Sequence, residues 1–231
     1  TMMKFRPFFL ALSAVALVSA GVRAEEVKKG PERWEKAIAE IEAREAAAKP
    51  AEGGLLFVGS SSIRLWDLAA SWPGENALNH GFGGSMLSDS VHFFDRLVPS
   101  FKPRAVILYA GDNDISLKRT AEQVLADFSA FAEKMERALP GVPLVYVAIK
   151  PSVKRWELWP EMKKANEAIA AICESREHLF FADIAAPMLR GAEGAPDASW
   201  FAKDGLHLSP KGYVLWTQVI AGQLQAAGAL K

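Results

Sequence analysis

Two residues near the C-terminus, Asp204 and His207, have the types and the spacing of a general base and its supporting carboxylate. A separation of three residues lets both side chains point the same way within one turn. The carboxylate can then accept a hydrogen bond from one imidazole nitrogen, which leaves the other nitrogen free to take a proton. A surface aspartate beside a helix-capping histidine is the alternative interpretation, because short motifs often match by chance.

Three consecutive hydroxyl groups, those of Ser60, Ser61 and Ser62, could be activated by such a base. A serine hydroxyl is a weak nucleophile until a neighbouring base removes its proton. The serines follow Gly59 where a strand is expected to turn into a helix, and a backbone N–H at a helix start can stabilise an oxyanion. A flexible loop or a helix cap is the alternative, because serine is favoured at helix starts.

Two further positions offer hydrogen-bond donors to a developing negative charge. Gly84 closes the stretch Gly81-Phe82-Gly83-Gly84, and without a side chain its backbone N–H can come close to a substrate. Asn113 has a side-chain amide that can donate in the same way. Singly, each position is equally typical of an ordinary turn.

Short apolar runs alternate with helical patterns, and these elements must position the polar residues. The runs are Leu55–Val58, Ala105–Ala110, Leu144–Ile149 and Leu179–Ile184, with a weaker run just before Asn79. Such runs are typical of strands buried on both faces. Apolar residues recur at steps of three and four over 124–139 and 162–172, and Ser209-Pro210 is a typical start for a final helix.

This alternation predicts an α/β fold with a parallel sheet covered by helices on both faces. In such a sheet the ligand crevice lies beyond the carboxyl ends of the strands. The serines, the glycines around residue 83 and the cluster around Asn113 each follow an apolar run. They are therefore expected to meet at one edge of the sheet.

Taken in chain order, four clusters resemble the four blocks of the SGNH hydrolase superfamily, which includes the GDSL-type esterases. The clusters are Gly59-Ser60-Ser61 for Gly-Asp-Ser, Asn79–Gly84 for Asn-x-Gly-x-x-Gly, Gly111–Asp114 for Gly-x-Asn-Asp, and Asp204–His207 for Asp-x-x-His. The resemblance spans about residues 53–226. It implies a three-layer α/β/α sandwich with a flavodoxin-like parallel sheet of about five strands.

The same resemblance implies roles for single residues. Ser61, Asp204 and His207 take the catalytic positions, and Ser61, Gly84 and Asn113 take those of the oxyanion hole. One departure is that Ser60 stands where the family usually has an acid. Ser62 is the second candidate for the nucleophile, a choice that geometry must decide.

The implied activity is that of an exported serine esterase, a carboxylic ester hydrolase that cleaves short-chain acyl esters, acetyl esters above all, through an acyl-enzyme. The alternatives are a lysophospholipase-like or acyltransferase activity on the same site, or a noncatalytic carbohydrate-binding protein. Arg155, Trp156 and Trp159 follow the run at 144–149 and are candidates for substrate binding. The aromatic rings could stack on a sugar or line an acyl pocket, and Arg155 could meet an anionic group. A packed loop anchor is the alternative.

Composition and motifs exclude several other classes of function. The chain has 27 Lys and Arg against 27 Asp and Glu, so the basic excess typical of a nucleic-acid binder is absent. The sequence contains neither a His-Glu-x-x-His motif nor a pair of cysteines, and it lacks the glycine motifs of nucleotide sites. We therefore expect no metal and no cofactor, and a small-molecule or carbohydrate ester as the partner.

The first residues have the pattern of a secretory signal peptide. Lys4 and Arg6 precede an apolar run over 8–20, and small residues follow by Ala24. We expect a signal peptide at 1–24, a helical segment at 25–52 and the hydrolase domain at 53–231. The protein would then be periplasmic or secreted, without stable membrane insertion after cleavage. An uncleaved anchor for the first segment and a mobile tether for the second are the alternatives.

Overall fold

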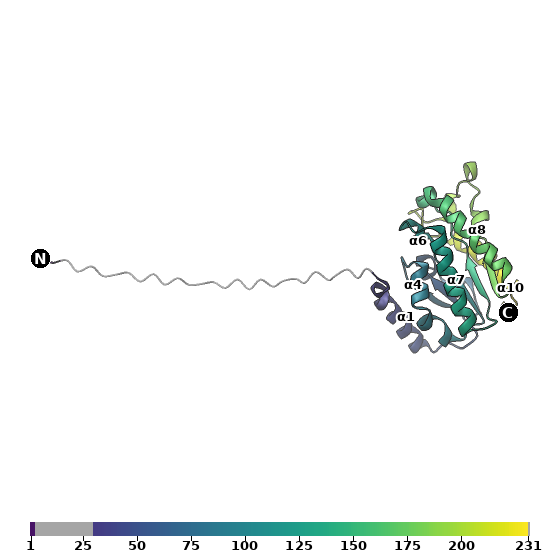
Figure 1. Cartoon of the computed structure of the whole chain (residues 1–231), viewed down its shortest axis with the longest axis horizontal. Helices are drawn as coiled ribbons and strands as arrows, with labels where there is room; N and C mark the ends of the chain where they lie inside the picture. The colour runs from purple at the N-terminus through teal and green to yellow at the C-terminus, as the bar shows by residue number, and fades with distance from the viewer. Residues whose placement is uncertain (3–29, 231) are drawn as a thin grey trace.

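The computed structural model describes residues 1–2 and 30–230 (Figure 1). Within them, five parallel strands form one sheet. The strand order is β2-β1-β3-β4-β5. The strands are β1 Leu55–Gly59, β2 Leu78–Gly81, β3 Ala105–Tyr109, β4 Leu144–Val147 and β5 Leu179–Ala182. The predicted parallel sheet of about five strands is confirmed.

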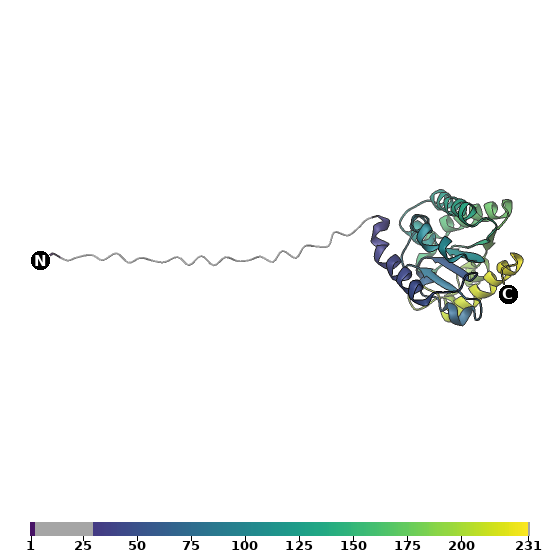
Figure 2. The same ribbon diagram turned by 90° about the horizontal axis from the view of Figure 1, so that it is seen from below.

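Helices cover both faces of this sheet, as the turned view in Figure 2 shows. One face carries α1 Glu35–Ala48, α4 Leu87–His92, α5 Phe94–Leu97, α7 Ala121–Ala138 and α8 Trp159–Ser175. The other carries α2 Ser61–Arg64, α3 Leu68–Ser71, α9 Ala185–Met188 and α10 Pro210–Ala226. The remaining helical pieces are α6 Asp112–Ser116 and the 3₁₀ turns η1 Pro31–Trp34, η2 Pro99–Phe101, η3 Val153–Leu158, η4 Ala192–Gly194 and η5 Ala198–Trp200. The layers are those of the predicted α/β/α sandwich.

The long helices form where the sequence has helical periodicity and a cap. Helix α7 begins after Thr120, whose hydroxyl accepts from the Gln123 N–H while the Gln123 side chain accepts from the Thr120 N–H. Helix α10 begins after Ser209, which accepts from the Gly212 N–H at 3.2 Å. Both caps satisfy N–H groups that have no partner inside the helix.

Strand β2 differs from the expectation, because Asn79 lies within the strand rather than after it. The Asn79 amide donates to the carbonyl oxygens of Ile63 at 2.7 Å and Trp66 at 3.2 Å. His80 is fully buried in the same strand. A polar side chain can lie within a buried strand when it is hydrogen-bonded, as Asn79 is. The apolar pattern of the sequence therefore did not show that β2 continues through Asn79 and His80.

The pairing register places the carboxyl ends of β1, β2 and β3 at the same level of the sheet. Gly59 pairs with Gly81 on one side and with Tyr109 on the other. Residues 60–62, 82–84 and 110–113 therefore leave the sheet side by side at its carboxyl edge. This is the edge at which the sequence places the chemistry.

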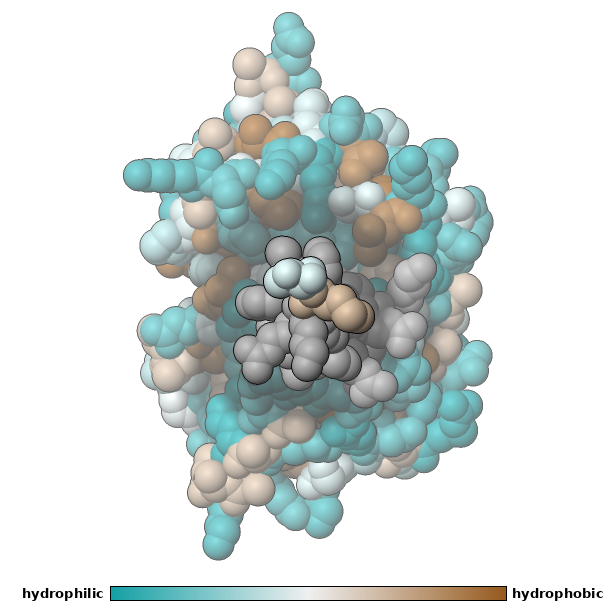
Figure 3. Space-filling model, turned by 90° about the vertical axis from the view of Figure 1, so that its left-hand side faces the viewer, coloured by the Kyte–Doolittle hydropathy of each residue, from teal (hydrophilic) through white to brown (hydrophobic). Residues whose placement is uncertain are grey.

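Helix α1 packs on the β2 side of the molecule. Ile38 and Ile41 are buried in the same core as α7, and the Glu45 carboxylate lies 3.6 Å from Nε2 of the buried His80. The face of the molecule on this side is mostly hydrophilic, with small and separate hydrophobic patches (Figure 3).

The predicted signal peptide lies outside the described residues except for residues 1–2, and the predicted boundaries at residues 24 and 52 stay predictions. Of the helices that the structure describes, none has the length and apolar character to cross a membrane.

Candidate active site

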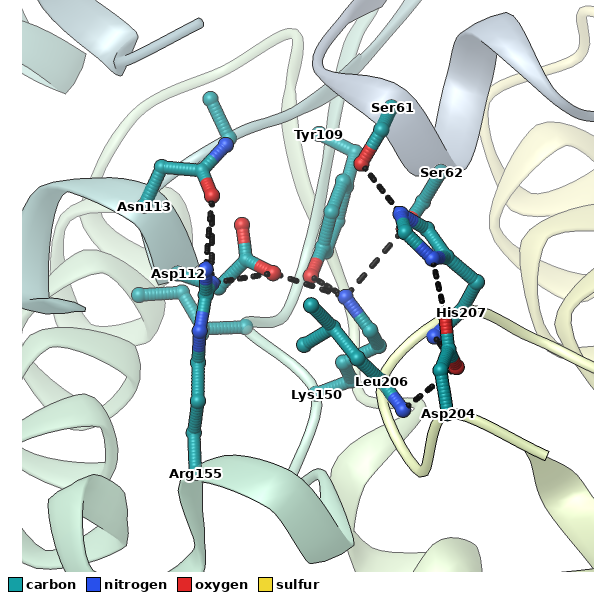
Figure 4. A network of polar contacts seen from close by, with 12 residues as sticks. Ser61, Ser62, Tyr109, Asp112, Asn113, Lys150, Arg155, Asp204, Leu206 and His207 are labelled. Atoms are coloured by element: carbon teal, nitrogen blue, oxygen red, sulfur yellow. Dashed lines mark hydrogen bonds and ion pairs between the residues drawn. The ribbon is translucent and has the colours of Figure 1, made fainter. Parts of the chain in front are cut away.

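Ser61, His207 and Asp204 form a chain of hydrogen bonds at the carboxyl edge of the sheet (Figure 4). His207 Nε2 lies 3.1 Å from Ser61 Oγ, and His207 Nδ1 lies 2.6 Å from Asp204 Oδ2. Asp204 Oδ1 accepts from the backbone N–H groups of Leu206 and His207, both at 3.0 Å. The Leu206 N–H and the His207 side chain are the main causes that hold the pKa of Asp204 well below its usual range. The carboxylate is thus ionised and fixed beside the imidazole.

The turn after β1 separates the three neighbouring hydroxyl groups. Gly59 has φ +141°, and a Cβ there would come within 1.9 Å of the Tyr109 carbonyl oxygen, so this turn requires glycine. Ser60 and Ser62 are fully buried, whereas Ser61 is half-buried at the first position of α2. Of the three, Ser61 is the hydroxyl that both meets His207 and reaches the surface.

The three predicted oxyanion donors belong to the segments that leave β1, β2 and β3 side by side. Gly84 is exposed with φ +82°, and a Cβ on it would lie 3.3 Å from the Trp34 ring. No described residue accepts a hydrogen bond from the N–H of Ser61 or of Gly84. Asn113 Nδ2 donates one proton to the Ser85 carbonyl oxygen at 3.0 Å. An amide nitrogen carries two protons, so one N–H of Asn113 is left for a substrate.

The family model of the GDSL-like lipase/acylhydrolase family matches residues 58–215. This range is more than half of the chain, and it contains all four clusters that carry the polar residues of the site. The chain belongs to the GDSL-like lipase/acylhydrolase family. The predicted resemblance and the predicted class, a carboxylic ester hydrolase, are confirmed.

Solved structures agree with this acylhydrolase fold. A GDSL-like lipase from Bacteroides thetaiotaomicron is 18% identical with a TM-score of 0.71, over 86% of this chain and 98% of that one. A carbohydrate esterase family 3 protein from Talaromyces cellulolyticus is 18% identical, with a TM-score of 0.60 over 78% and 100%. A catalytic mutant of an acetylxylan esterase from Geobacillus stearothermophilus is 15% identical, with a TM-score of 0.59 over 75% and 94%. A comparison with curated protein sequences finds no significant match.

A buried lysine lies beside the site of this acylhydrolase, and sequence reasoning missed it. Lys150 Nζ donates to Tyr109 Oη at 2.8 Å, to Asp112 Oδ2 at 2.8 Å and to Ser62 Oγ at 3.2 Å. Burial lowers the pKa of Lys150, and the ion pair with Asp112 opposes that shift. Burial alone would raise the pKa of Asp112, but Lys150 and Arg155 outweigh it and hold the pKa below its usual value. A charged residue directly after the apolar run at 144–149 was the signal that could have found it.

The three candidates for substrate binding lie together on η3 and the start of α8. Arg155 is bonded to Asn113, since both of its terminal nitrogens lie 3.1 Å from Asn113 Oδ1. Trp156 and Trp159 stack on each other, with ring centroids 6.2 Å apart and an angle of 15° between the planes. Both rings are partly exposed, and Trp159 also lines a cavity of about 260 Å³ between α8 and α9. Their roles stay predictions.

The described residues include no group of His, Cys, Asp or Glu side chains that could hold a metal ion. Ser61, His207 and Asp204 have the residue types and the contacts of a nucleophile, a base and its supporting carboxylate. Such a set is sufficient for acyl transfer.

Proposed function

We propose that this protein is an exported serine esterase that hydrolyses short-chain acyl esters, with acetyl esters preferred, through an acyl-enzyme on Ser61. His207 is the general base and acid, and Asp204 orients its imidazole. The backbone N–H groups of Ser61 and Gly84 and the Asn113 amide form the oxyanion hole. The single observation that carries the proposal is the continuous contact from Asp204 through His207 to Ser61, at 2.6 and 3.1 Å.

Acylation begins when His207 Nε2 takes the proton of Ser61 Oγ and Oγ attacks the ester carbonyl carbon. The carbonyl oxygen becomes an oxyanion that accepts hydrogen bonds from the three donors. As this intermediate collapses, the bond to the alcohol oxygen breaks. His207 returns the proton to the leaving alcohol, and Ser61 keeps the acyl group.

Deacylation repeats these steps with water. His207 Nε2 takes a proton from a water molecule, whose oxygen attacks the acyl carbonyl carbon. The same donors hold the second oxyanion. The bond to Ser61 Oγ then breaks, His207 gives its proton to Oγ, and the carboxylic acid leaves.

The alcohol part of the substrate is proposed to be a carbohydrate. The stacked rings of Trp156 and Trp159 offer a flat, partly exposed aromatic surface on η3 and α8, and such surfaces suit the apolar face of a sugar. Two structures of the same fold are described as a carbohydrate esterase and an acetylxylan esterase. Export is proposed from the signal-peptide pattern of residues 1–24.

The test is a comparison of Ser61→Ala with Ser175→Ala, a change at an exposed serine at the end of α8. Ser61→Ala is expected to lower kcat on p-nitrophenyl acetate by at least about 10⁴-fold and to abolish labelling by a fluorophosphonate probe. Ser175→Ala is expected to behave as the wild type. The rates on acetate, butyrate and octanoate esters then show which acyl length is preferred. The rate on acetylated xylan shows whether the alcohol part is a carbohydrate. Wild-type activity in Ser61→Ala would end the assignment.

A further inference from the structure

The side-chain amide of Asn113 has to face one way for the proposed mechanism to work. An asparagine amide carries an oxygen on one side and an NH₂ group on the other, and a half-turn about its last bond exchanges them. An N–H group that faces the substrate stabilises an oxyanion, whereas an oxygen in the same place repels it. The rate therefore depends on what holds this amide.

Two sets of contacts oppose the half-turn. Asn113 Nδ2 donates to the Ser85 carbonyl oxygen at 3.0 Å, and Asn113 Oδ1 accepts from both terminal nitrogens of Arg155 at 3.1 Å. After a half-turn, N–H groups would face the guanidinium and one carbonyl oxygen would face another. The Arg155 contact is the stronger of the two, because its donor is charged and bonds the oxygen twice.

The guanidinium of Arg155 is held in turn by a buried carboxylate. Asp112 Oδ2 lies 3.3 Å from one terminal nitrogen of Arg155 and 2.8 Å from Lys150 Nζ (Figure 4). The side chains of Lys150 and Asp112 are only 1% and 5% exposed. Because water is excluded from these charge pairs, their electrostatic attraction is stronger than at the surface. Asp112, itself paired with Lys150, therefore holds the guanidinium of Arg155 in one position.

Lys150 connects this group to the other half of the site. Its remaining two ammonium protons go to Tyr109 Oη and to Ser62 Oγ, the neighbour of the proposed nucleophile. An ammonium has three donors, and here all three are used. One hydrogen-bonded group of side chains thus runs from the start of α2 to the Asn113 amide.

We propose that Arg155 is a positioning residue, which holds the Asn113 amide with one N–H directed at the oxyanion, and that Asp112 and Lys150 hold Arg155. This inference rests on the esterase function proposed above and deepens it. It is proposed in place of the expectation that Arg155 meets an anionic group of the substrate, since the terminal nitrogens of the guanidinium already contact Asn113 and Asp112. Arg155 then affects the transition state through Asn113.

The experiment is a double-mutant cycle of Arg155→Met and Asn113→Ala with p-nitrophenyl acetate, an uncharged ester. Asn113→Ala is expected to lower kcat by about 10²–10³-fold, the usual loss for one oxyanion donor. Arg155→Met is expected to lower kcat by about tenfold with KM within about twofold, because the amide remains but is no longer held. In the Asn113→Ala background, Arg155→Met is expected to change kcat by less than about twofold.

Two further variants test whether the effect depends on the paired hydrogen bonds of Arg155. Arg155→Lys keeps the charge but loses the paired hydrogen bonds, so it is expected to recover part of the lost kcat. It also serves if Arg155→Met unfolds early, which a thermal melt of each variant detects. Arg137→Met, at an exposed ion pair on α7, is the matched control and is expected to keep wild-type kinetics.

The outcomes separate the possible roles of Arg155. Equal losses of kcat in both backgrounds would overturn the inference, because Arg155 would then act without Asn113. A rise in KM at unchanged kcat would overturn it in favour of substrate binding. Failure of the esterase proposal itself looks different, since either the wild type would not hydrolyse p-nitrophenyl acetate or Ser61→Ala would remain as active as the wild type.

Discussion

At the scale of single residues, Asp204 acts on His207 with both of its oxygens. One takes the imidazole Nδ1–H at 2.6 Å, and the other takes the backbone N–H of the same residue at 3.0 Å. A neutral imidazole that donates from Nδ1 has an unprotonated Nε2, which is the state a base for Ser61 needs. The carboxylate therefore selects both the orientation and the tautomer.

Asp204→Asn is accordingly expected to lower kcat on p-nitrophenyl acetate by about 10³–10⁴-fold, with a much smaller change in KM. An asparagine has one acceptor oxygen, and its NH₂ group favours the wrong tautomer when it faces Nδ1. Steady-state kinetics of this variant are compared with those of Asp95→Asn, whose side chain is 75% exposed. A loss of less than tenfold would contradict the role given to Asp204.

The proposed catalytic residues could be named from the sequence because each lies in a short contiguous motif. The charge of Lys150 directly after an apolar run is visible in the sequence, but its role is not, because its three partners come from α2, from the end of β3 and from α6. Nothing in the local sequence tells which way a side chain points once a buried strand has ended. Arg155 is a candidate substrate contact on its chemistry alone, because its contacts with Asn113 and Asp112 are not visible in the sequence.

At the scale of elements, η1 reaches the loop that carries Gly84. The Trp34 ring lies against Gly84, and Trp34 Nε1 donates to Asp89 Oδ2 at 2.9 Å. The same Asp89 oxygen accepts the Met86 N–H at 2.9 Å, so one carboxylate joins η1 to the start of α4. Residues before the matched range of the family thus contact the proposed oxyanion hole.

Trp34→Ala is therefore expected to lower kcat by about three- to tenfold, because the Gly84 loop loses both the ring and the hydrogen bond that support it. Trp34→Phe keeps most of the ring and is expected to lose less. Both are measured on p-nitrophenyl acetate beside Glu40→Ala, an exposed change on α1. Unchanged kcat in Trp34→Ala would mean that the loop keeps its shape unaided.

Asp114 joins α6 to α4, and it makes stability depend on pH. Both of its oxygens accept the Leu87 N–H, at 3.2 and 3.1 Å, and burial raises its pKa from 3.8 to about 7. Between these two values the folded chain keeps a proton that the unfolded chain loses. The free energy of unfolding therefore falls as pH rises, by up to about 1.4 kcal/mol per pH unit from this group.

Asp114→Asn removes that titration. The stability of the wild type minus that of the variant is expected to decrease from pH 4.5 to pH 7 and then to level off. Urea unfolding at four pH values measures this difference, with Asp95→Asn as the control for an exposed carboxylate. A difference that stays constant over this range would contradict the raised pKa.

The long elements could be predicted, whereas the short ones could not. Strands β1, β3, β4 and β5 are recognised as continuous apolar runs, α7 and α8 by their helical periodicity, and α10 by its Ser-Pro start. Helices α2, α3, α5 and α9 have four residues each, and a single turn has no period to recognise. Their form comes from neighbours, as when the Asn79 amide bonds the carbonyl oxygens of Ile63 and Trp66 at the end of α2.

At the scale of the whole molecule, the sheet separates two hydrophobic cores. One lies under α7 and α8 and includes residues of α1, and the other lies under α10. Every segment that brings a proposed catalytic group to the carboxyl edge is anchored in one of them. A segment that belongs to a core is part of the cooperative fold, whatever its position in the sequence.

Helix α1 is the segment on which this cooperativity can be tested, because the sequence alone was also compatible with a mobile tether there. Ile38 is fully buried in the core that also contains Phe131 of α7. Ile38→Ala is expected to lower the free energy of unfolding by about 2–5 kcal/mol, the same range that is expected for Ile107→Ala in the central strand, because both side chains are fully buried. Urea unfolding is followed by circular dichroism and by tryptophan fluorescence, and for each protein the curves from the two probes should coincide.

Glu40→Ala, on the exposed side of the same helix, is the control and should change the free energy of unfolding by less than about 0.5 kcal/mol. If Ile38→Ala were equally mild, α1 would be an attachment to the fold and not a part of it, and the contact of Trp34 in the preceding turn η1 with the Gly84 loop would lose its support.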